Sequence, residues 1–462
     1  MNLRILIYLN PSNIDKVTHE FKLEADSGFV IIKNSILALN KYVDWHFYIL
    51  VPDLNCWRDR PNNVTLIEYP YINDALNSRF HFNSVVLNDV FSNYRQDIDF
   101  IWSMLPEVVA NLKAFAIKRR EELPIFTFIN WMDYKKTKGY EPSYKLRMLE
   151  GILEADIVGI QSHHMLNTMK EILSGHEIPE DKIHIMPPKT ISNNTLPEIG
   201  NIIGFPHRVS TESGFYEMYN LIKDHLNMKL WISNINNAQV EDDPNVVNEY
   251  FADRELYYQQ ISNLRFGISY HINYSMWSMS VLDMLAHGKC VLAPNKNAFP
   301  EMFPDNYPYL FNDNKEFLSM FKHLQSCNKK ELLKWGQKCM DYVNNRFTWD
   351  IQAKTIKRLF MDQLHAKKTN RAKDISSIIR KYNAITKSDL INKNMTEFHR
   401  RISRSWNKTR IDMMRNYGIK DDITSSETIF YYDCERYTRN RIEKRGTMLD
   451  QLTIYDIIDD KA

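Results

Sequence analysis

The sequence predicts an α/β protein of two halves, in which each half is a parallel β-sheet covered by helices and a cleft separates the two sheets. Short apolar runs of strand length alternate with amphipathic segments of helical period from residue 4 to residue 186. The same alternation starts again at residue 201, after a polar loop at residues 190–198 that we expect to be a hinge. Ligands of open parallel sheets bind outside the carboxyl ends of the strands, so the cleft is the expected binding site.

The first half is expected to form one open sheet, because its strand-length apolar runs are separated by segments of helical period. Its strands are expected at residues 4–9, 46–51, 64–69, 100–104, 125–129, 157–160 and 183–186. Its helices are expected at residues 29–41, 108–122 and 143–154, where apolar residues recur at a spacing of three and four.

The second half is expected to repeat this arrangement. Its strands are expected at residues 201–204, 229–232, 265–269 and 290–293, and its helices at residues 214–224, 280–287, 315–325 and 330–345. We therefore divide the chain into an N-terminal domain at residues 1–190, a C-terminal domain at residues 199–345, a crossover helix at residues 346–364 and a helical appendage at residues 365–462.

Composition places the chain among globular proteins. Of its 462 residues, 44% are hydrophobic and 25% are charged, and the net charge is only +2. No run of about 18 apolar residues is present, so no transmembrane segment is expected. The apolar run at residues 5–9 is too short for a signal peptide. The five cysteines are scattered without a Cys-x-x-Cys pair, which favours a reducing cytoplasm over a disulfide framework or a zinc site.

The stretch from residue 275 to residue 301 contains groups that suit a nucleotide diphosphate. A polar loop leads into a helix at Ser278 or Ser280, and both serines are favourable N-caps. The backbone N–H groups and the positive dipole end of such a helix attract phosphates. Asp283 follows about one turn later, where a carboxylate can accept hydrogen bonds from two ribose hydroxyls. Gly288 is expected to end the helix before the next buried strand.

This stretch resembles the C-terminal signature of the GT-B glycosyltransferases, especially the retaining group called family 4. Their pattern is approximately E-G-F-G-x-x-x-x-E-A-x-A-x-G-x-P-V-V-A, followed by G-G-x-P-E. Asp283 stands at the second acidic position, Gly288 at the glycine and Glu301 at the terminal acidic residue. Ser275 replaces the first acidic residue, which the family places near the transferred sugar. Asn297 and Ala298 replace the paired glycines.

The resemblance implies two Rossmann-like domains that face each other across a cleft. Residues 1–190 would form the acceptor domain and residues 199–345 the nucleotide-sugar domain. It also implies that Ser275, Ser278, Ser280 and Asp283 bind a nucleotide-sugar donor, with a UDP-sugar favoured, and that Glu301 lies near the sugar or the phosphates. A strand–helix–strand unit without catalytic function is the structural alternative.

A second stretch, at residues 204–215, resembles the family's G-R-x-x-x-x-K-G-F, which follows the first strand of the C-terminal domain. Arg208 fits the arginine that neutralises the donor diphosphate, and such a cation stabilises the negative charge that develops on the leaving nucleotide. The usual lysine is absent, because Ser213 occupies its position. An ordinary surface arginine in a strand–helix loop is the alternative interpretation.

The first half offers weaker candidates. Gly28 follows the first strand and opens a helix, as does the glycine-bearing loop near the donor phosphates in the family, although an ordinary turn fits equally well. Asp133 follows a buried strand and is a candidate acceptor base or orienting residue, with a structural turn as the alternative. His163 and His164 lack acidic or cysteine partners at metal-binding spacing, which indicates helix packing.

Metal-dependent glycosyltransferases of the GT-A type need an Asp-x-Asp at the end of a strand. The triplet from Asp97 to Asp99 precedes the strand expected at residues 100–104. We therefore expect no essential metal and no cofactor other than the nucleotide-sugar donor.

The C-terminal region is strongly basic. From residue 365 to residue 420 the chain has 15 Lys and Arg residues and four Asp and Glu residues, a net charge of +11. Helical periodicity is present at residues 375–382, 388–403 and 406–417. Such a surface suits the phosphate backbone of nucleic acid. Docking on the protein's own domains, binding of an acidic partner and contact with anionic lipid are the alternatives.

These observations predict a cytoplasmic glycosyltransferase that moves a hexosyl or pentosyl group from a nucleotide diphosphate to an acceptor hydroxyl. The basic appendage resembles that of viral enzymes that glycosylate hydroxymethylated DNA bases, so DNA is the favoured acceptor and partner. A lipid-linked or surface glycan is the alternative acceptor. A nucleic-acid-binding protein with a degenerate GT-B part is a second alternative, which the replacements at Ser275 and Ser213 keep open.

Overall fold

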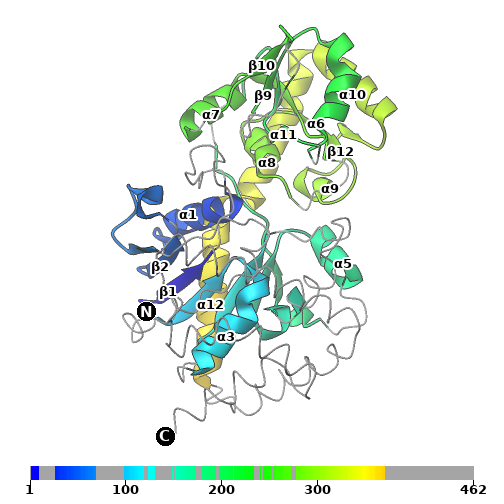
Figure 1. Ribbon diagram of the computed structural model, residues 1–462. Helices are drawn as coiled ribbons and strands as arrows, with labels where there is room; N and C mark the ends of the chain where they lie inside the picture. Colours follow the sequence, from blue (N-terminus) through cyan, green and yellow to red (C-terminus); the bar gives the residue numbers. More distant parts are fainter. Residues whose placement is uncertain are drawn as a thin grey trace, which may run out of the picture.

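Two fully parallel sheets form the framework of the computed structural model, one in each half of the chain (Figure 1). The first has the strand order β3-β2-β1-β4-β5-β6-β7, and the second has the order β10-β9-β8-β11-β12-β13. The structure describes residues 2–9, 26–51, 53–68, 98–118, 123–130, 148–149, 151–172, 178–193, 197–211, 213–233, 240, 243–251, 253–271 and 277–369. Each sheet therefore has the doubly wound order of a Rossmann-like domain, which confirms the predicted fold class.

The strands of the first sheet are β1 (Arg4–Tyr8), β2 (His46–Val51), β3 (Val64–Glu68), β4 (Phe100–Ser103), β5 (Ile125–Ile129), β6 (Ile157–Ile160) and β7 (Ile183–Ile185). Its helices include α1 (Ser27–Leu39), α3 (Val109–Lys118) and α5 (His163–Ile172). The predicted strands are confirmed to within two residues at either end. Of the helix predicted at residues 143–154, the described residues are helical up to Glu154.

The strands of the second sheet are β8 (Ile202–Phe205), β9 (Lys229–Ile232), β10 (Val246–Asn248), β11 (Leu264–Ile268), β12 (Val291–Pro294) and β13 (Leu310–Phe311). Its helices are α6 (Phe215–Ile222), α7 (Arg254–Ser262), α8 (Met279–Ala286), α9 (Phe299–Met302), α10 (Asn314–Ser326) and α11 (Lys329–Arg346). The sequence did not predict the edge strands β10 and β13, or helix α7.

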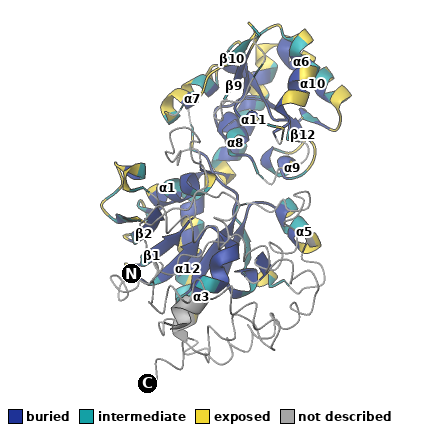
Figure 2. Ribbon diagram, viewed as in Figure 1, coloured by how far each residue is buried: buried dark blue, intermediate teal, exposed yellow. Residues whose placement is uncertain are grey.

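The inner strands of both sheets are buried on their two faces (Figure 2). All five residues of β5 and all five residues of β11 are buried. This burial explains why the strands are continuous apolar runs without the alternation of a half-exposed strand. Within the described residues, no helix is both long and apolar enough to cross a membrane.

Helix α12 (Trp349–Thr369) returns from the second half and packs against the first sheet and α1 (Figure 1). The Phe360 ring stacks on Phe100, with 4.0 Å between ring centroids, and on Trp45, at 5.8 Å. The Gln352 side-chain amide donates a hydrogen bond to the hydroxyl oxygen of Ser35 at 3.1 Å. The N-terminal core is therefore completed by residues from the far end of the described chain.

The predicted helices at residues 375–382, 388–403 and 406–417 lie outside the described residues, and so does most of the basic region.

Candidate active site

The second sheet reverses its strand order between β8 and β11, and the loops that follow these two strands carry polar side chains. His207 and Arg208 follow β8, and Ser269 and His271 follow β11. The crevice at such a reversal is where doubly wound sheets bind ligands. These residues therefore define the candidate site at the carboxyl edge of the second sheet.

The His207 and His271 rings contact each other at an angle of 78°, with 4.7 Å between their centroids. The Nδ1 atom of His207 lies 2.9 Å from the Ser280 Oγ, and the Nδ1 atom of His271 lies 3.2 Å from the Ser269 Oγ. Burial, followed by the neighbouring His271, lowers the pKa of His207 well below its usual value. Burial and the nearby Arg208 guanidinium lower the pKa of His271 to about 4. Both rings are therefore neutral at pH 7.

Arg208 is exposed beside this neutral pair. An exposed guanidinium at the carboxyl edge of the sheet can form a bidentate contact with an anion. Its assignment to the donor diphosphate stays a prediction.

Ser278 is the N-cap of helix α8, one of the two caps predicted, and its Oγ accepts a hydrogen bond from the Val281 backbone N–H at 3.3 Å. The Ser280 hydroxyl lies 3.3 Å from the Ser278 hydroxyl and also contacts His207. The two serines thus join the start of α8 to the loop after β8. Their roles in donor binding stay predictions, and Ser275 lies outside the described residues.

Ser213 and Gly214, two residues of the motif at residues 204–215, form the turn before α6. Gly214 has a φ of 70°, and a Cβ there would lie 2.5 Å from the backbone oxygen of Tyr270, so only glycine fits without a shift. The Ser213 hydroxyl donates to the Ser210 carbonyl oxygen at 2.9 Å and closes the turn. In this chain, the position of the family's lysine therefore has a structural role in the turn.

The Asp283 carboxylate is buried and already contacts protein groups. Its Oδ1 accepts a hydrogen bond from the Thr190 hydroxyl at 2.6 Å, and its Oδ2 lies 3.6 Å from Arg254 Nη2. Thr190 belongs to the predicted hinge, so Asp283 joins α8 to the segment that connects the two halves. Its role as a ribose ligand stays a prediction.

Glu301, on α9 of the second half, contacts the N-terminus of α5 in the first half. Its carboxylate accepts hydrogen bonds from the backbone N–H groups of His163, at 2.8 Å, and His164, at 2.7 Å. The His163 Nδ1 lies 3.0 Å from the same carboxylate. Helix α5 follows β6, and α9 follows β12, so this contact places the carboxyl edges of the two sheets opposite each other.

The Glu301→Ala variant is expected to loosen this contact, because two helix N–H groups lose a charged acceptor. Hydrogen bonds to charged groups contribute about 1.5–3 kcal/mol each. Small-angle X-ray scattering should give a larger radius of gyration for the variant than for the wild type. The exposed Glu255, within the second half, provides the control substitution Glu255→Ala. Equal radii for all three proteins would contradict a closing role for Glu301.

The first half contributes a polar network beside its strand ends. The Gln161 amide donates to the Asn130 Oδ1 at 2.8 Å, and the Asn130 amide donates to the Ser27 Oγ at 2.8 Å. Gly28 is half-buried in the first turn of α1, where Asp26 is the N-cap. A donor-binding role for Gly28 stays a prediction. Asp133 lies outside the described residues.

Several residues of this region were not predicted as site residues. His207 and His271 come from separate strands, and only the strand order brings them together. His163 was interpreted as a helix-packing residue because it lacks a nearby acidic residue in the sequence. Its acidic partner, Glu301, is 138 positions away. Asp99, in contrast, accepts a hydrogen bond from the Arg4 backbone N–H at 2.9 Å and acts within the sheet.

A buried lysine, Lys189, directly precedes the predicted hinge. Lys189 Nζ donates to the Arg346 carbonyl oxygen at 3.1 Å, at the end of α11. Burial lowers the pKa of Lys189 to about 7. The neighbouring Thr190 pairs with Thr348, so the two segments that connect the halves lie side by side.

Lys189→Met is expected to change how stability depends on pH. Between the lowered folded pKa and the ordinary pKa of 10.5, the unfolded chain binds more protons at Lys189, so this residue makes stability rise with pH. Between pH 7 and pH 9 the contribution is on the order of 2 kcal/mol, since one pH unit corresponds to about 1.4 kcal/mol. Urea unfolding at several pH values should show a flatter rise in the variant.

A smaller rise should persist in Lys189→Met, because burial also lowers the pKa of Lys289, to about 8. The exposed Lys322 offers the control Lys322→Met. Parallel stability curves for the wild type and Lys189→Met would show that the buried amine does not titrate in this range.

Comparison with known proteins supports the class of fold. No protein-family model and no curated protein matches the chain. Sucrose-phosphate synthase from Thermosynechococcus elongatus is similar in structure, with a TM-score of 0.62 and 11% identity over 79% of this chain and 100% of that chain. The two-sheet arrangement is that of the GT-B glycosyltransferases, and this chain has that fold.

Two further solved structures have the same arrangement. Anabaena HepE in complex with UDP and glucose has a TM-score of 0.59 and 9% identity, over 78% of this chain and 100% of that chain. A glycosyltransferase from Rickettsia africae has a TM-score of 0.56 and 14% identity, over 79% of this chain and 99% of that chain.

Proposed function

We propose that the protein is a glycosyltransferase that uses a nucleotide-sugar donor, with a UDP-sugar as the favoured donor. The observation that carries this proposal is that three features lie at the carboxyl edge of the second sheet. These are the exposed Arg208, the start of α8 at Ser278, and Glu301, which reaches the first half. The GT-B fold and the UDP complex of HepE support the choice of donor.

In this proposal the second half binds the donor, and the first half binds the acceptor. The bond between the sugar C1 and the diphosphate oxygen breaks, a bond from C1 to the acceptor oxygen forms, and the acceptor hydroxyl loses its proton. Arg208 and the N–H groups at the start of α8 stabilise the charge on the departing diphosphate. Asp133 is the proposed acceptor base, and Asp283 the proposed ribose ligand.

The neutral histidine pair supports this assignment. His207 contacts Ser280 and, through its ring, His271, so the pair fixes the polar end of α8 without adding charge. Because both histidine rings are neutral, they add no positive charge to that of Arg208 beside them. This arrangement favours one diphosphate group at the edge of the sheet.

Isothermal titration with UDP, followed by an assay of UDP release from UDP-sugars, tests the donor. Binding of UDP with a defined stoichiometry and slow hydrolysis of one UDP-sugar are expected. Absence of binding to UDP, ADP, GDP and their sugar derivatives would contradict the proposal and favour a binding protein with a degenerate GT-B part.

We further propose that DNA carrying hydroxymethylated bases is the acceptor. The observation that favours it is the net charge of +11 at residues 365–420. Phosphate contacts from such a region supply affinity that falls steeply with salt. A glycan acceptor on a lipid is the alternative, in which the same cations contact anionic headgroups.

Fluorescence titration of the full chain with duplex DNA at several salt concentrations tests the acceptor. A triple variant in which Arg400, Arg401 and Arg404 become glutamate should lower the salt slope by about three, since each lost phosphate contact lowers it by about one. Changing the exposed Arg58, Lys315 and Lys322 to glutamate is the control. Equal slopes in all three proteins would exclude the basic region as a DNA contact.

A further inference from the structure

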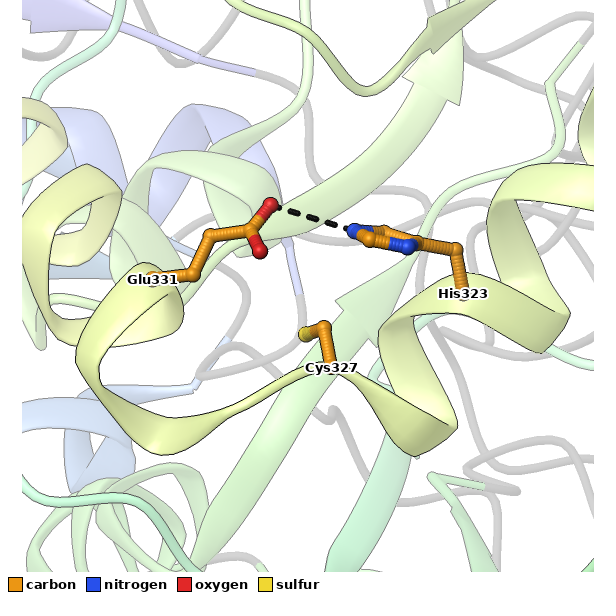
Figure 3. A group of neighbouring side chains, drawn as sticks. All are labelled: His323, Cys327 and Glu331. Carbon is orange, nitrogen blue, oxygen red and sulfur yellow. Dashed lines mark hydrogen bonds and ion pairs between the residues drawn. The ribbon is translucent and has the colours of Figure 1, made fainter.

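Three side chains of metal-binding type gather where α10 meets α11 (Figure 3). His323 lies on the last turns of α10, Cys327 at its C-cap and Glu331 in the first turn of α11. One ligand atom from each residue lies within 4.8 Å of the other two. The His323 Nε2 and the Glu331 Oε1 are 3.1 Å apart. The cluster thus offers an imidazole nitrogen, a sulfur and a carboxylate oxygen to one point.

The local chain geometry explains why these residues meet. His323 and Cys327 are four positions apart, which places them on one side of the helix. Cys327 then adopts an extended conformation, with φ −63° and ψ 155°, and Asn328 caps the next helix. This reversal of the chain brings Glu331, a further four positions along, back to the same point.

Groups from the sheet hold the cluster in place. The Tyr309 hydroxyl donates a hydrogen bond to Glu331 Oε1 at 2.8 Å. Arg265 donates from Nε to the Leu324 carbonyl oxygen at 3.0 Å, and from Nη2 to the Cys327 carbonyl oxygen at 2.5 Å. These contacts are of the kind that orients metal ligands from the outside.

The cluster lies at the opposite edge of the second sheet from the candidate active site. Tyr309 directly precedes β13, and Arg265 is the second residue of β11, so both mark the amino ends of strands. Arg208 and Ser269 follow the carboxyl ends of β8 and β11. A metal bound here would therefore not touch a donor held at the carboxyl edge.

We propose that His323, Cys327 and Glu331 bind a Zn²⁺ ion in a structural site, with a water molecule as the fourth ligand. A nitrogen, a thiolate sulfur and a carboxylate oxygen together favour Zn²⁺ over Mg²⁺ and Ca²⁺, which prefer oxygen ligands alone. Tetrahedral ligands at about 2.0–2.3 Å from zinc are roughly 3.3–3.8 Å apart. The separation of 3.1 Å between His323 Nε2 and Glu331 Oε1 is already slightly below this range. A separation at the 4.8 Å limit of the cluster would have to shorten by about 1 Å.

The charge balance of binding follows from the state of the thiol. A cysteine thiol is ordinarily protonated at neutral pH, whereas the thiolate is the form that binds a metal. Zinc binding forms the S–Zn bond and releases the thiol proton to the solvent. Zinc binding also breaks the His323–Glu331 hydrogen bond. The proton on His323 Nε2 moves to Nδ1 of the neutral ring, Nε2 and a Glu331 oxygen each bind the metal, and Tyr309 continues to donate to Glu331. Affinity is therefore expected to rise with pH.

Titration of the chelator-treated full chain with Co²⁺ tests the site, because a cobalt–thiolate bond gives a charge-transfer absorption that oxygen and nitrogen ligands do not give. We expect one such site, from which Zn²⁺ displaces Co²⁺. Both Cys327→Ser and His323→Gln should weaken binding at least about 100-fold, since outer-shell changes alone cost about 10- to 100-fold. Cys327→Ser should also abolish the absorption.

Matched substitutions separate this site from other thiols and imidazoles. Cys56→Ser, in the first half, and His225→Gln, at an exposed histidine of the second half, should leave the titration unchanged. Circular dichroism in the presence of chelator checks that Cys327→Ser remains folded. Wild-type protein without the absorption, or a Cys327→Ser variant that keeps it, would overturn the proposal. Because the readout is spectroscopic, the outcome is independent of glycosyl transfer.

Discussion

Arg208→Ala is expected to abolish most donor turnover while leaving the fold intact. The side chain is exposed, so its loss removes little packing. The loss of one group that stabilises transition-state charge typically costs on the order of 10²- to 10³-fold in rate. The measurement is UDP release from the UDP-sugar that the wild type hydrolyses, together with UDP affinity by calorimetry. The pKa of His271 should also rise, because Arg208 contributes to lowering it.

Two further variants identify what Arg208 does. Arg208→Lys should recover only part of the activity, because an ammonium cannot make the bidentate contact of a guanidinium. Lys322→Ala removes one cation from the same half, on α10, and should retain wild-type turnover. Equal activity of Arg208→Ala and the wild type would place the diphosphate elsewhere and remove the main support for the proposed donor site.

Gly336→Ala is expected to destabilise the protein, although alanine is the better helix former by about 1 kcal/mol. Gly336 is buried within α11, and a Cβ there would lie 2.0 Å from the Gly288 backbone oxygen. Gly288 has a φ of 65° at the end of α8, so its backbone cannot simply move away. Overpacking of this kind costs about 1–3 kcal/mol, which corresponds to a fall in Tm of roughly 2–12 °C.

Thermal unfolding followed by circular dichroism measures this effect. The control is Lys334→Ala at an exposed position of the same helix, where a change of less than about 0.5 kcal/mol is expected. A higher Tm for Gly336→Ala would mean that helix propensity outweighs the contact. In that case the approach of α11 to the end of α8 would be looser than the structure indicates.

The framework of the fold could be predicted from the sequence because most of its strands are buried on both faces. The strands β2, β5, β6 and β9 were predicted with the observed bounds. The missed strands β10 and β13 have only three and two residues, and β10 has no buried position. Helix α7 was missed because its apolar residues are few, with only Tyr257 and Ile261 buried.

The site could be predicted only where its residues are close in the sequence. The polar loop before an apolar helix predicted an N-cap at Ser278 or Ser280, and the structure has Ser278 as the cap. The contacts of His207 with His271, and of Glu301 with α5, depend on strand order and on how the two halves meet. A local sequence pattern reveals neither the strand order nor how the two halves meet. These contacts therefore could not be predicted from the sequence.

The position of α12 has a consequence for how the protein is made. The first sheet is complete in the sequence by residue 185, but the Phe360 ring that fills its core is synthesised about 170 residues later. At about 5–20 residues per second, a ribosome needs roughly 9–35 s to reach it. During that interval the nascent N-terminal half has an open apolar face beside Trp45 and Phe100, and it is then a natural substrate for chaperones.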